Sequence, residues 1–235
     1  MTQIMKDRRR LVLFSGAGMS AESGISTFRD SGGLWENYDI EDVATPQAFL
    51  KNPALVQSFY NQRRKQIIET QPNAAHSIIK ELEADFDVVV ITQNIDDLHE
   101  RAGSKNVIHL HGNIRFAKSS GPNQEKKYYP IEGWELKKSD KCEDDYPLRP
   151  HVVWFGEEVP MIEIAAQEIR KADILIVIGT SLNVYPAAGL IHATNENCTK
   201  VLIDPNAGNM TIPNEFEIIA DLASEGLKKW KMKNE

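Results

Sequence analysis

The chain has 235 residues, of which 41% are hydrophobic, and carries a formal net charge of -7. This length suits one large domain, or one domain with a small insertion, whereas the acidic balance argues against a dedicated nucleic-acid binder, which needs a basic face. Two cysteines cannot form a disulfide framework, and no apolar run approaches the roughly 20 residues of a membrane span. The basic start does not resemble a signal peptide, so we expect a soluble, cytoplasmic protein without membrane contacts. We also expect a monomer.

The first predicted strand is the apolar run at residues 11–14, which is typical of a strand buried on both faces of a parallel sheet. Residues 16–21 (GAGMSA) follow with the G-x-G-x-x-G/A spacing of a dinucleotide-binding turn. A dehydrogenase would continue with a long helix, a second strand and an acidic residue. Here Ser23 and Gly24 cut the helix short and a polar loop at residues 28–33 follows, so the pattern disfavours hydride transfer.

Residues 53–68 predict a helix, because Asn52 can cap its start and a proline suits its first turn. Tyr60 and Arg63 lie one turn apart on the apolar stripe of this helix, whereas Arg64 points elsewhere. An arginine on an apolar face is costly unless it binds an anion, and its planar guanidinium suits a carboxylate. The alternative is an arginine that reaches solvent or pairs with a protein carboxylate.

Further strands and helices alternate along the chain. Strands are predicted at residues 88–91, 107–110, 174–178 and 201–203, and helices at 74–86 and 161–172. The alternation indicates an α/β fold, a doubly wound Rossmann-like parallel sheet, in which ligands bind beyond the carboxyl ends of the strands. The expected division is an NAD-binding domain at about 8–111 and 149–230, an inserted small module at about 112–148 and a helical insertion at about 36–72.

Five motifs in fixed order carry a resemblance to a known family: GAGMSAESGISTFRD, TQNIDDLH, HLHGN, LRPHVVWFGE and GTSLNVYPAA. Over residues 11–188, with a looser tail to about Ala223, the chain resembles the sirtuins, NAD-dependent protein lysine deacylases. The resemblance implies NAD as a consumed co-substrate, acyl-lysine proteins or peptides as partners, and nicotinamide, O-acyl-ADP-ribose and free lysine as products. It assigns catalysis to His111, Asn94 and Asp96.

The same resemblance assigns the binding residues. NAD would contact Gly16, Ala17, Gly18, Ser20, Phe28, Arg29, Trp35, Gln93, Asn94, Ile95, Asp96, Gly179, Thr180, Ser181, Asp204 and Ala223. The acyl-lysine peptide would lie as an added strand against Val153, Phe155, Gly156, Glu157 and Val184. Tyr60 and Arg63 resemble the pair with which some sirtuins hold succinyl or malonyl groups, so we expect a short acidic acyl group to be preferred and acetyl to be a lesser substrate.

Several of these residues have simpler explanations. His111 suits a general base, because imidazole has a pKa near neutrality, yet core hydrogen bonding would also explain a histidine there. His109 and His111 share one side of an extended segment, as a metal pair would, but no third ligand is convincingly spaced. Residues 179–181 also fit a plain strand-to-helix turn. Apolar packing alone would explain Val153 and Val184. Asp97, unlike Asp96, is interpreted as a helix N-terminal charge.

The chain departs from the family at two points. Most sirtuins bind a structural zinc through two cysteine pairs, whereas only Cys142 lies between His111 and Arg149. Zinc is therefore not expected, and aromatic packing and hydrogen bonds should hold the small module. In the segment VLIDPN, either Leu202 or Asp204 stands where the family usually has an asparagine that contacts the adenosine ribose.

Two alternatives to a deacylase remain open on the sequence. One is an NAD glycohydrolase or ADP-ribosyltransferase built on the same site, which would release nicotinamide without an acylated peptide. The other is a non-catalytic NAD-binding module, which would bind NAD without turnover.

Overall fold

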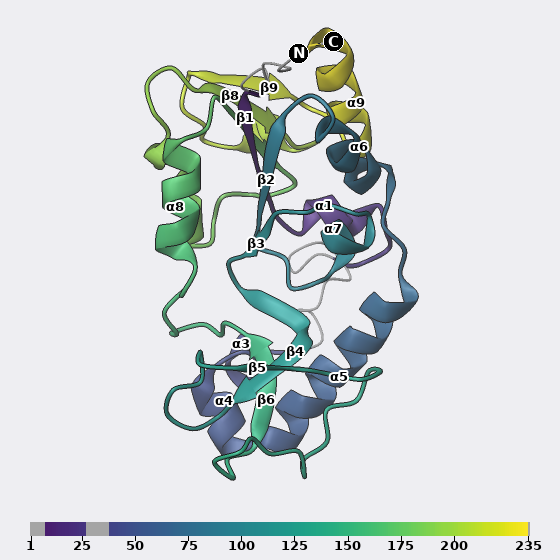
Figure 1. The fold of residues 1–235 in the computed structure, drawn as a ribbon, viewed down its shortest axis with the longest axis vertical. Coiled ribbons are helices and arrows are strands. Elements are labelled where there is room, and N and C mark those ends of the chain that lie inside the picture. The colour runs from purple at the N-terminus through teal and green to yellow at the C-terminus, as the bar shows by residue number, and fades with distance from the viewer. Residues whose placement is uncertain (1–7, 27–37, 235) are drawn as a thin grey trace, which may run out of the picture.

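The structure is a computed structural model that describes residues 8–26 and 38–234. A six-stranded parallel sheet occupies one end of the elongated molecule, with the strand order β3-β2-β1-β7-β8-β9 (Figure 1). The strands are β1 (Arg10–Ser15), β2 (Asp87–Thr92), β3 (Val107–His109), β7 (Ile174–Ile178), β8 (Thr199–Ile203) and β9 (Phe216–Ile219). The continuous apolar runs of β1, β2 and β7 lie side by side at the centre of the sheet, where both faces of a strand are buried.

Helices cover both faces of this sheet. On one face α8 (Ile162–Arg170) and the 3-10 helix η1 (Ala187–Ala193) pack against Phe14, Ile91 and Val177. On the other face α6 (Ala74–Leu82) and α9 (Ala223–Asn234) pack against Leu13 and Val90 (Figure 1). The arrangement is the doubly wound α/β fold that the alternating sequence pattern predicted.

A smaller lobe occupies the other end of the molecule (Figure 1). It combines α3 (Ile40–Val43), α4 (Pro46–Lys51) and α5 (Pro53–Glu69) with an antiparallel sheet of β4 (Gly112–Ser119), β5 (Tyr128–Pro130) and β6 (Leu148–Val152), in the order β5-β4-β6. Val56, Phe59 and Ile67 of α5 pack against Ile114 of β4 and Trp154 after β6. The helical insertion therefore packs against β4 of the small module, which also has a small apolar cluster of its own.

Two short helices connect the elements: α1 (Gly18–Ala21) follows β1, and α7 (Leu98–Arg101) follows β2. A second 3-10 helix, η2 (Ala207–Asn209), follows β8. Gly24 has a φ of +87°, so the break after α1 lies where the sequence predicted it. Among the described residues, no helix has the length and apolar character that crossing a membrane requires.

Candidate active site

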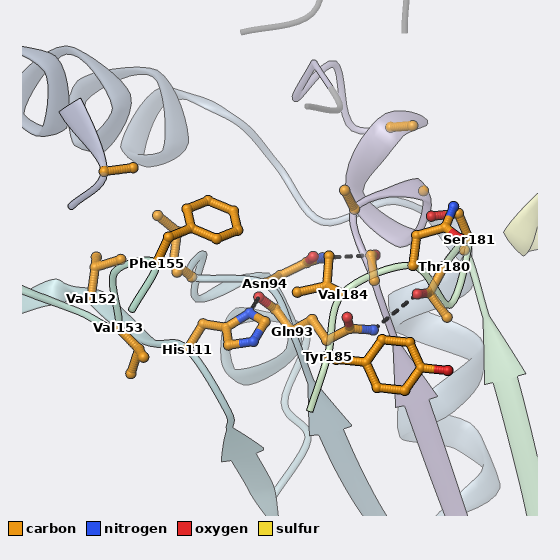
Figure 2. Close-up of a pocket in the computed structure, with 18 of the residues that line it drawn as sticks. Gln93, Asn94, His111, Val152, Val153, Phe155, Thr180, Ser181, Val184 and Tyr185 are labelled. Atoms are coloured by element: carbon orange, nitrogen blue, oxygen red, sulfur yellow. Dashed lines mark hydrogen bonds between the residues drawn. The ribbon is translucent and has the colours of Figure 1, made fainter. Parts of the chain in front are cut away.

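A cavity of about 580 Å³ lies between the two lobes, beyond the carboxyl ends of β1, β2 and β7 (Figure 2). Most of the predicted site residues line it: Gly16, Ala17, Gly18, Gln93, Asn94, Ile95, Gly179, Thr180, Ser181, Asp204 and Ala223 from the predicted NAD set, His111, and Tyr60, Arg63, Val153, Phe155, Gly156, Glu157 and Val184 from the predicted substrate set. Ser20 and Asp96 lie behind the cavity wall, whereas Phe28, Arg29 and Trp35 lie outside the described residues.

Three glycines form the strand-end wall by letting two loops touch. The backbone N–H of Gly18 donates to the carbonyl of Gly179 at 2.8 Å. A Cβ atom on Gly16 would lie 2.6 Å from Cβ of Thr180, and one on Gly18 would lie 2.8 Å from Cα of Gly179. Gly179 has a φ of +59°, and a Cβ there would lie 2.3 Å from the nitrogen of Met19. The glycine spacing thus allows the loops after β1 and β7 to pack closely, which the sequence could not show.

The turn after β2 carries two amide side chains that are held by hydrogen bonds (Figure 2). Gln93 Nε2 donates to Thr180 Oγ1 at 3.0 Å. Asn94 Nδ2 donates to the Gly16 carbonyl at 3.0 Å and to Ser20 Oγ at 3.1 Å. These bonds tie the turns after β1, β2 and β7 together, so both amides face the cavity in fixed orientations.

Asp96 lies one layer behind this wall and is only 4% exposed. Its Oδ1 accepts from the backbone N–H of Leu98 at 3.2 Å, and its Oδ2 accepts from Ser20 Oγ at 3.0 Å. Burial raises the pKa of Asp96, and the two hydrogen bonds oppose that rise. Ser20 and Asp96, both predicted to contact NAD, are hydrogen-bonded to each other in this structure.

His111 is oriented by the backbone of the turn after β2. Its Nδ1 lies 2.9 Å from the Gln93 carbonyl oxygen (Figure 2). A carbonyl only accepts, so Nδ1 carries the proton and Nε2 is the basic nitrogen. Burial lowers the pKa of His111 below 6.5, partly opposed by this hydrogen bond, so the ring is neutral at pH 7. Gly112 has a φ of +80° and comes so close to the His151 carbonyl that a Cβ would lie 2.3 Å from its oxygen.

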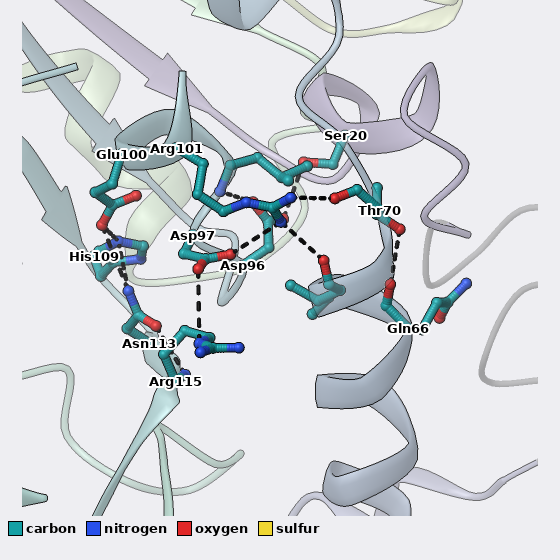
Figure 3. A network of polar contacts seen from close by, with 12 residues as sticks. Ser20, Gln66, Thr70, Asp96, Asp97, Glu100, Arg101, His109, Asn113 and Arg115 are labelled. Atoms are coloured by element: carbon teal, nitrogen blue, oxygen red, sulfur yellow. Dashed lines mark hydrogen bonds and ion pairs between the residues drawn. The ribbon is translucent and has the colours of Figure 1, made fainter. Parts of the chain in front are cut away.

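His109 has different partners (Figure 3). Its Nε2 lies 2.6 Å from Glu100 Oε1 and its Nδ1 lies 3.1 Å from the Asn94 carbonyl oxygen. Burial lowers the pKa of His109, but the hydrogen bond and the charge of Glu100 outweigh it and the net pKa is raised. Both ring nitrogens therefore have protein partners, which does not support the metal pair. In the described part of the chain, His, Cys, Asp and Glu form no group of three that could hold a metal ion.

Asp97 links the two lobes, as Figure 3 shows. It stands at the start of α7, as predicted for a helix N-terminal charge. Its carboxylate lies 3.6 Å from Arg101 of α7 and 3.7 Å from Arg115 of β4. Arg101 also donates to the carbonyl of Ile67 at 3.0 Å, near the end of α5. This network fixes the end of α5 relative to the turn that carries Asn94.

Tyr60 and Arg63 line the cavity from α5, one helical turn apart. They are 4% and 6% exposed, and Phe59, Ile40 and Ala44 supply apolar walls beside them. Burial lowers the pKa of Arg63 to about 10, whereas the charge of Asp96 opposes the fall. The guanidinium is therefore still a cation at pH 7, in a pocket that is otherwise largely apolar.

Segments 152–156 and 184–185 contribute the side chains of the cavity mouth (Figure 2). Phe155 is 47% exposed and Tyr185 is 75% exposed. Glu157 also lines the cavity, but its carboxylate accepts two hydrogen bonds from Arg149, at 2.6 and 2.9 Å, and one from the backbone N–H of Trp154 at 2.8 Å. Glu157 therefore shapes the segment from within.

The structure separates the two candidates in the VLIDPN segment. Leu202 lies in β8 with no exposed surface and packs in the sheet core. Asp204 follows the end of β8, is 9% exposed and lines the cavity. Its Oδ1 accepts from the backbone N–H of Asn206 at 2.8 Å. Asp204, and not Leu202, stands at the ligand side.

Sequence reasoning missed Trp154 and Tyr185 as cavity residues. Both stand inside quoted motifs, so the motifs located the segments and not these side chains. Trp154 Nε1 donates to the Tyr60 hydroxyl at 3.1 Å. That partner is far away in the sequence, so no local pattern could have indicated the contact.

Comparisons with known proteins agree with this architecture. Residues 16–186 match the Sir2 family. An NAD-dependent protein deacylase of Bacteroides thetaiotaomicron is 51% identical over 227 residues, which is 95% of this chain and 97% of that protein. An NAD-dependent protein deacylase of Helicobacter pylori strain J99 is 47% identical over 222 residues, covering 94% of this chain and 93% of that protein.

Solved structures give the same result. A mutant Sir2 homologue in complex with ADP-ribose superposes with a TM-score of 0.85 and 38% identity, over 96% of this chain and 92% of that one. A Sir2 homologue in complex with NAD superposes with a TM-score of 0.82 and 39% identity, over 96% of this chain and 89% of that one. The chain therefore belongs to the Sir2 family, the sirtuins.

Proposed function

We propose that this protein is an NAD-dependent protein lysine deacylase that prefers short acidic acyl groups such as succinyl and malonyl, with acetyl as a lesser substrate. The observation that carries the proposal is one cavity that contains the glycine-lined strand ends, the neutral His111 and the buried cation Arg63. The relatives named above support the deacylase activity. The acidic preference is supported by Arg63 and Tyr60.

The strand-end half of the cavity fits NAD chemically. Gly16, Gly18 and Gly179 line the cavity without side chains, which leaves room for a diphosphate close to the strand ends, and Thr180 and Asp204 offer a hydroxyl and a carboxylate for ribose hydroxyls. NAD would supply the acyl acceptor, since its ADP-ribose takes the acyl group as nicotinamide leaves. The side chains of the turn after β2 would orient it, with Asn94 already held in place from two sides.

His111 would act as the general base in this site. Its Nε2 carries the lone pair because Nδ1 donates to the Gln93 carbonyl. Nε2 would take the proton of a ribose hydroxyl when that oxygen attacks the acyl carbon, whose own oxygen has displaced nicotinamide from the ribose. One water would be consumed as the lysine amine leaves. The apolar residues around the acyl-lysine channel, including Phe155 and Val184, would exclude bulk water from the reacting atoms.

Arg63 would bind the terminal carboxylate of the acyl group, and the Tyr60 hydroxyl would donate a second hydrogen bond to it. A guanidinium and a carboxylate form a strong, charge-assisted pair when both are shielded from water. An acetyl group ends in a methyl group and has no carboxylate. It would therefore enter the pocket without pairing with Arg63 and Tyr60.

Exchanging Arg63 for methionine tests the acyl preference. We expect Arg63→Met to lower kcat/KM for a succinyl-lysine peptide by about 100-fold, the scale of a lost charge-assisted pair, and to change acetyl-lysine turnover much less. A peptide with the neutral succinamoyl group has the same length without the charge. The difference in kcat/KM between the succinyl and succinamoyl peptides should therefore nearly vanish in the Arg63→Met variant. Lys65→Met, on the same helix but outside the cavity, is the control. Equal losses on all three peptides would disprove the pocket assignment.

A further inference from the structure

The wall of the acyl pocket contains a hydrogen bond whose polarity is fixed by chemistry. Trp154 Nε1 lies 3.1 Å from the Tyr60 hydroxyl oxygen. An indole N–H can only donate, so the hydroxyl oxygen is the acceptor in this bond. The single proton of the hydroxyl is therefore directed away from the indole. Tyr60 is 4% exposed and lines the cavity, and burial raises the pKa of its hydroxyl, so it keeps that proton.

Trp154 itself is held firmly from several sides. Its backbone N–H donates to Glu157, and the guanidinium carbon of Arg149 lies 3.3 Å from the centre of its ring. The ring of Phe49 lies 5.3 Å away, measured between centroids. Glu157 and Arg149 are joined by two hydrogen bonds, so the cation on the ring face is itself neutralised and fixed. The indole is only 3% exposed and has little freedom to turn.

Two arginines lie near this wall. Arg149 is paired with Glu157 and lies over the ring of Trp154. Arg63 lines the inner cavity, one turn along α5 from Tyr60. The Tyr60 hydroxyl and the Arg63 guanidinium therefore line the same cavity, and both are donors. A carboxylate is a ligand group that accepts hydrogen bonds from a hydroxyl and from a guanidinium.

We propose that Trp154 is a positioning residue for acyl specificity, which orients the Tyr60 hydroxyl so that it donates to the terminal carboxylate of an acidic acyl group. The inference rests on the proposed function and adds to it a residue that does not touch the acyl carboxylate. Arg149 and Glu157 hold Trp154 in place. Without the indole N–H, the Tyr60 hydroxyl is free to rotate in the free enzyme. It must then give up that rotational freedom when the acyl group binds, which weakens binding.

The test is a double-mutant cycle between Trp154 and Tyr60. Trp154→Phe keeps an aromatic ring and removes the N–H, and Tyr60→Phe removes the hydroxyl. We expect Trp154→Phe to raise the KM for a succinyl-lysine peptide about fivefold to tenfold, the effect of one hydrogen bond, with a smaller change on an acetyl-lysine peptide. In the Tyr60→Phe background, the same exchange should have less than a twofold further effect, because the bond is already absent.

A packing control separates orientation from general damage. Phe49→Leu trims another aromatic neighbour of Trp154 that makes no hydrogen bond to Tyr60 in the structure. We expect it to affect succinyl and acetyl peptides equally. Two results would overturn the role of Trp154 alone. In one, the effects of the two exchanges on KM multiply in the double variant. In the other, Trp154→Phe impairs the succinyl and acetyl peptides equally. A wild-type enzyme that deacetylates but does not desuccinylate would overturn the acyl preference as well.

Discussion

Among single residues, His111 determines the pH dependence that we expect. Its lowered pKa means that the neutral, basic form predominates at neutral pH and is lost as the pH falls through the folded-state pKa, which lies below 6.5. The acid limb of kcat/KM should therefore have its midpoint below pH 6.5. Rates measured from pH 5 to 8 would show this, with His192→Ala, an exposed histidine on η1, as a control. A midpoint clearly above 6.5 would contradict the assigned environment of the base.

Gly179 provides a second prediction for a single residue. Alanine there must adopt a φ of +59° with its Cβ 2.3 Å from a backbone nitrogen. Gly133 has a similar φ of +71°, but a Cβ there would meet nothing within 4 Å. Gly133→Ala should cost about 1 kcal/mol of unfolding free energy from strain alone, and Gly179→Ala should cost clearly more and weaken NAD binding. Urea unfolding and NAD titration compare the two, and equal costs would refute the packing argument.

The sequence was informative about individual residues where a motif has a local cause. Ordered motifs brought Asn94, His111 and Thr180 to one cavity, because strand ends of a parallel sheet converge. The contact between Tyr60 and Trp154 and the burial of Asp96 depend on packing between distant segments, which no local pattern encodes.

Among the elements, α5 and the small sheet are joined by a buried arginine that the sequence only described as pointing elsewhere. Arg64 has no exposed surface. Its Nε donates to the Ile114 carbonyl at 2.6 Å, and one terminal nitrogen donates to Asn61 Oδ1 at 2.7 Å and to the Trp134 carbonyl at 2.9 Å. Burial lowers the pKa of Arg64 to about 10, so it remains charged at pH 7. These bonds connect the helix that carries Arg63 to β4 and to the segment after β5.

Arg64→Leu should therefore loosen the whole small lobe. It leaves the buried Ile114 carbonyl, the buried Asn61 side chain and the half-buried Trp134 carbonyl without their donor, and we expect a loss of about 3 kcal/mol or more in unfolding free energy. Lys65→Leu removes a neighbouring, exposed cation and should cost less than 1 kcal/mol. Calorimetry of both variants provides the comparison. A loss below 1 kcal/mol for Arg64→Leu would show that other contacts hold the lobe.

The same lobe is where the prediction about zinc belongs. Cys142 packs with Ala117, Ile131, Leu136 and Leu148 in a small apolar cluster. We propose that this cluster and Arg64 hold the module without zinc. Elemental analysis of purified protein should find far less than one zinc per chain, and a stoichiometric value would reject the proposal.

The central strands and the edge strand β3 were predictable, whereas the last strand and the last helix were not. β1, β2 and β7 are apolar runs bounded by polar residues, a pattern that is typical of buried strands. The edge strand β9 is short with two exposed residues, and α9 has a polar composition, so neither gave a clear pattern. β6 extends the small sheet to Val152, beyond the expected end of the module at 148, because its pairing with β4 is a tertiary contact.

For the whole molecule, buried histidines should make the fold sensitive to acid. Burial lowers the pKa of His76 and of His151 to about 4, and that of His99 well below its ordinary value of 6.5. The unfolded chain therefore binds more protons than the folded one between pH 6.5 and 4, and stability is full above pH 6.5 and falls below it. His109, whose pKa is raised, opposes this trend.

Between pH 7 and 5.5, His76 and His151 should each remove about 1 kcal/mol of unfolding free energy, and His99 should add to the loss. Urea midpoints measured across this range at constant ionic strength test the expectation. His151→Phe should reduce the slope of stability against pH, because it removes one titrating imidazole. Phenylalanine suits the position, since the His151 ring stacks on Tyr128. A flat stability profile would contradict the burial of these rings.

The cavity between the two lobes joins the features on which the proposed activity depends. The Rossmann-like lobe supplies the strand ends and His111, and α5 of the smaller lobe supplies Tyr60 and Arg63. The network around Asp97 and Arg101 fixes one lobe against the other (Figure 3). In the proposed function, NAD would be held at the strand ends of the Rossmann-like lobe and the acyl group would be held by α5 of the smaller lobe.

The most direct measurement is mass spectrometry of NAD incubated with the enzyme and a succinyl-lysine, an acetyl-lysine or an unmodified peptide. The account predicts fastest conversion of the succinyl peptide, with matching amounts of nicotinamide and O-succinyl-ADP-ribose, slower conversion of the acetyl peptide, and no nicotinamide with the unmodified one. Equal nicotinamide release without an acyl group would contradict the account and identify an NAD glycohydrolase.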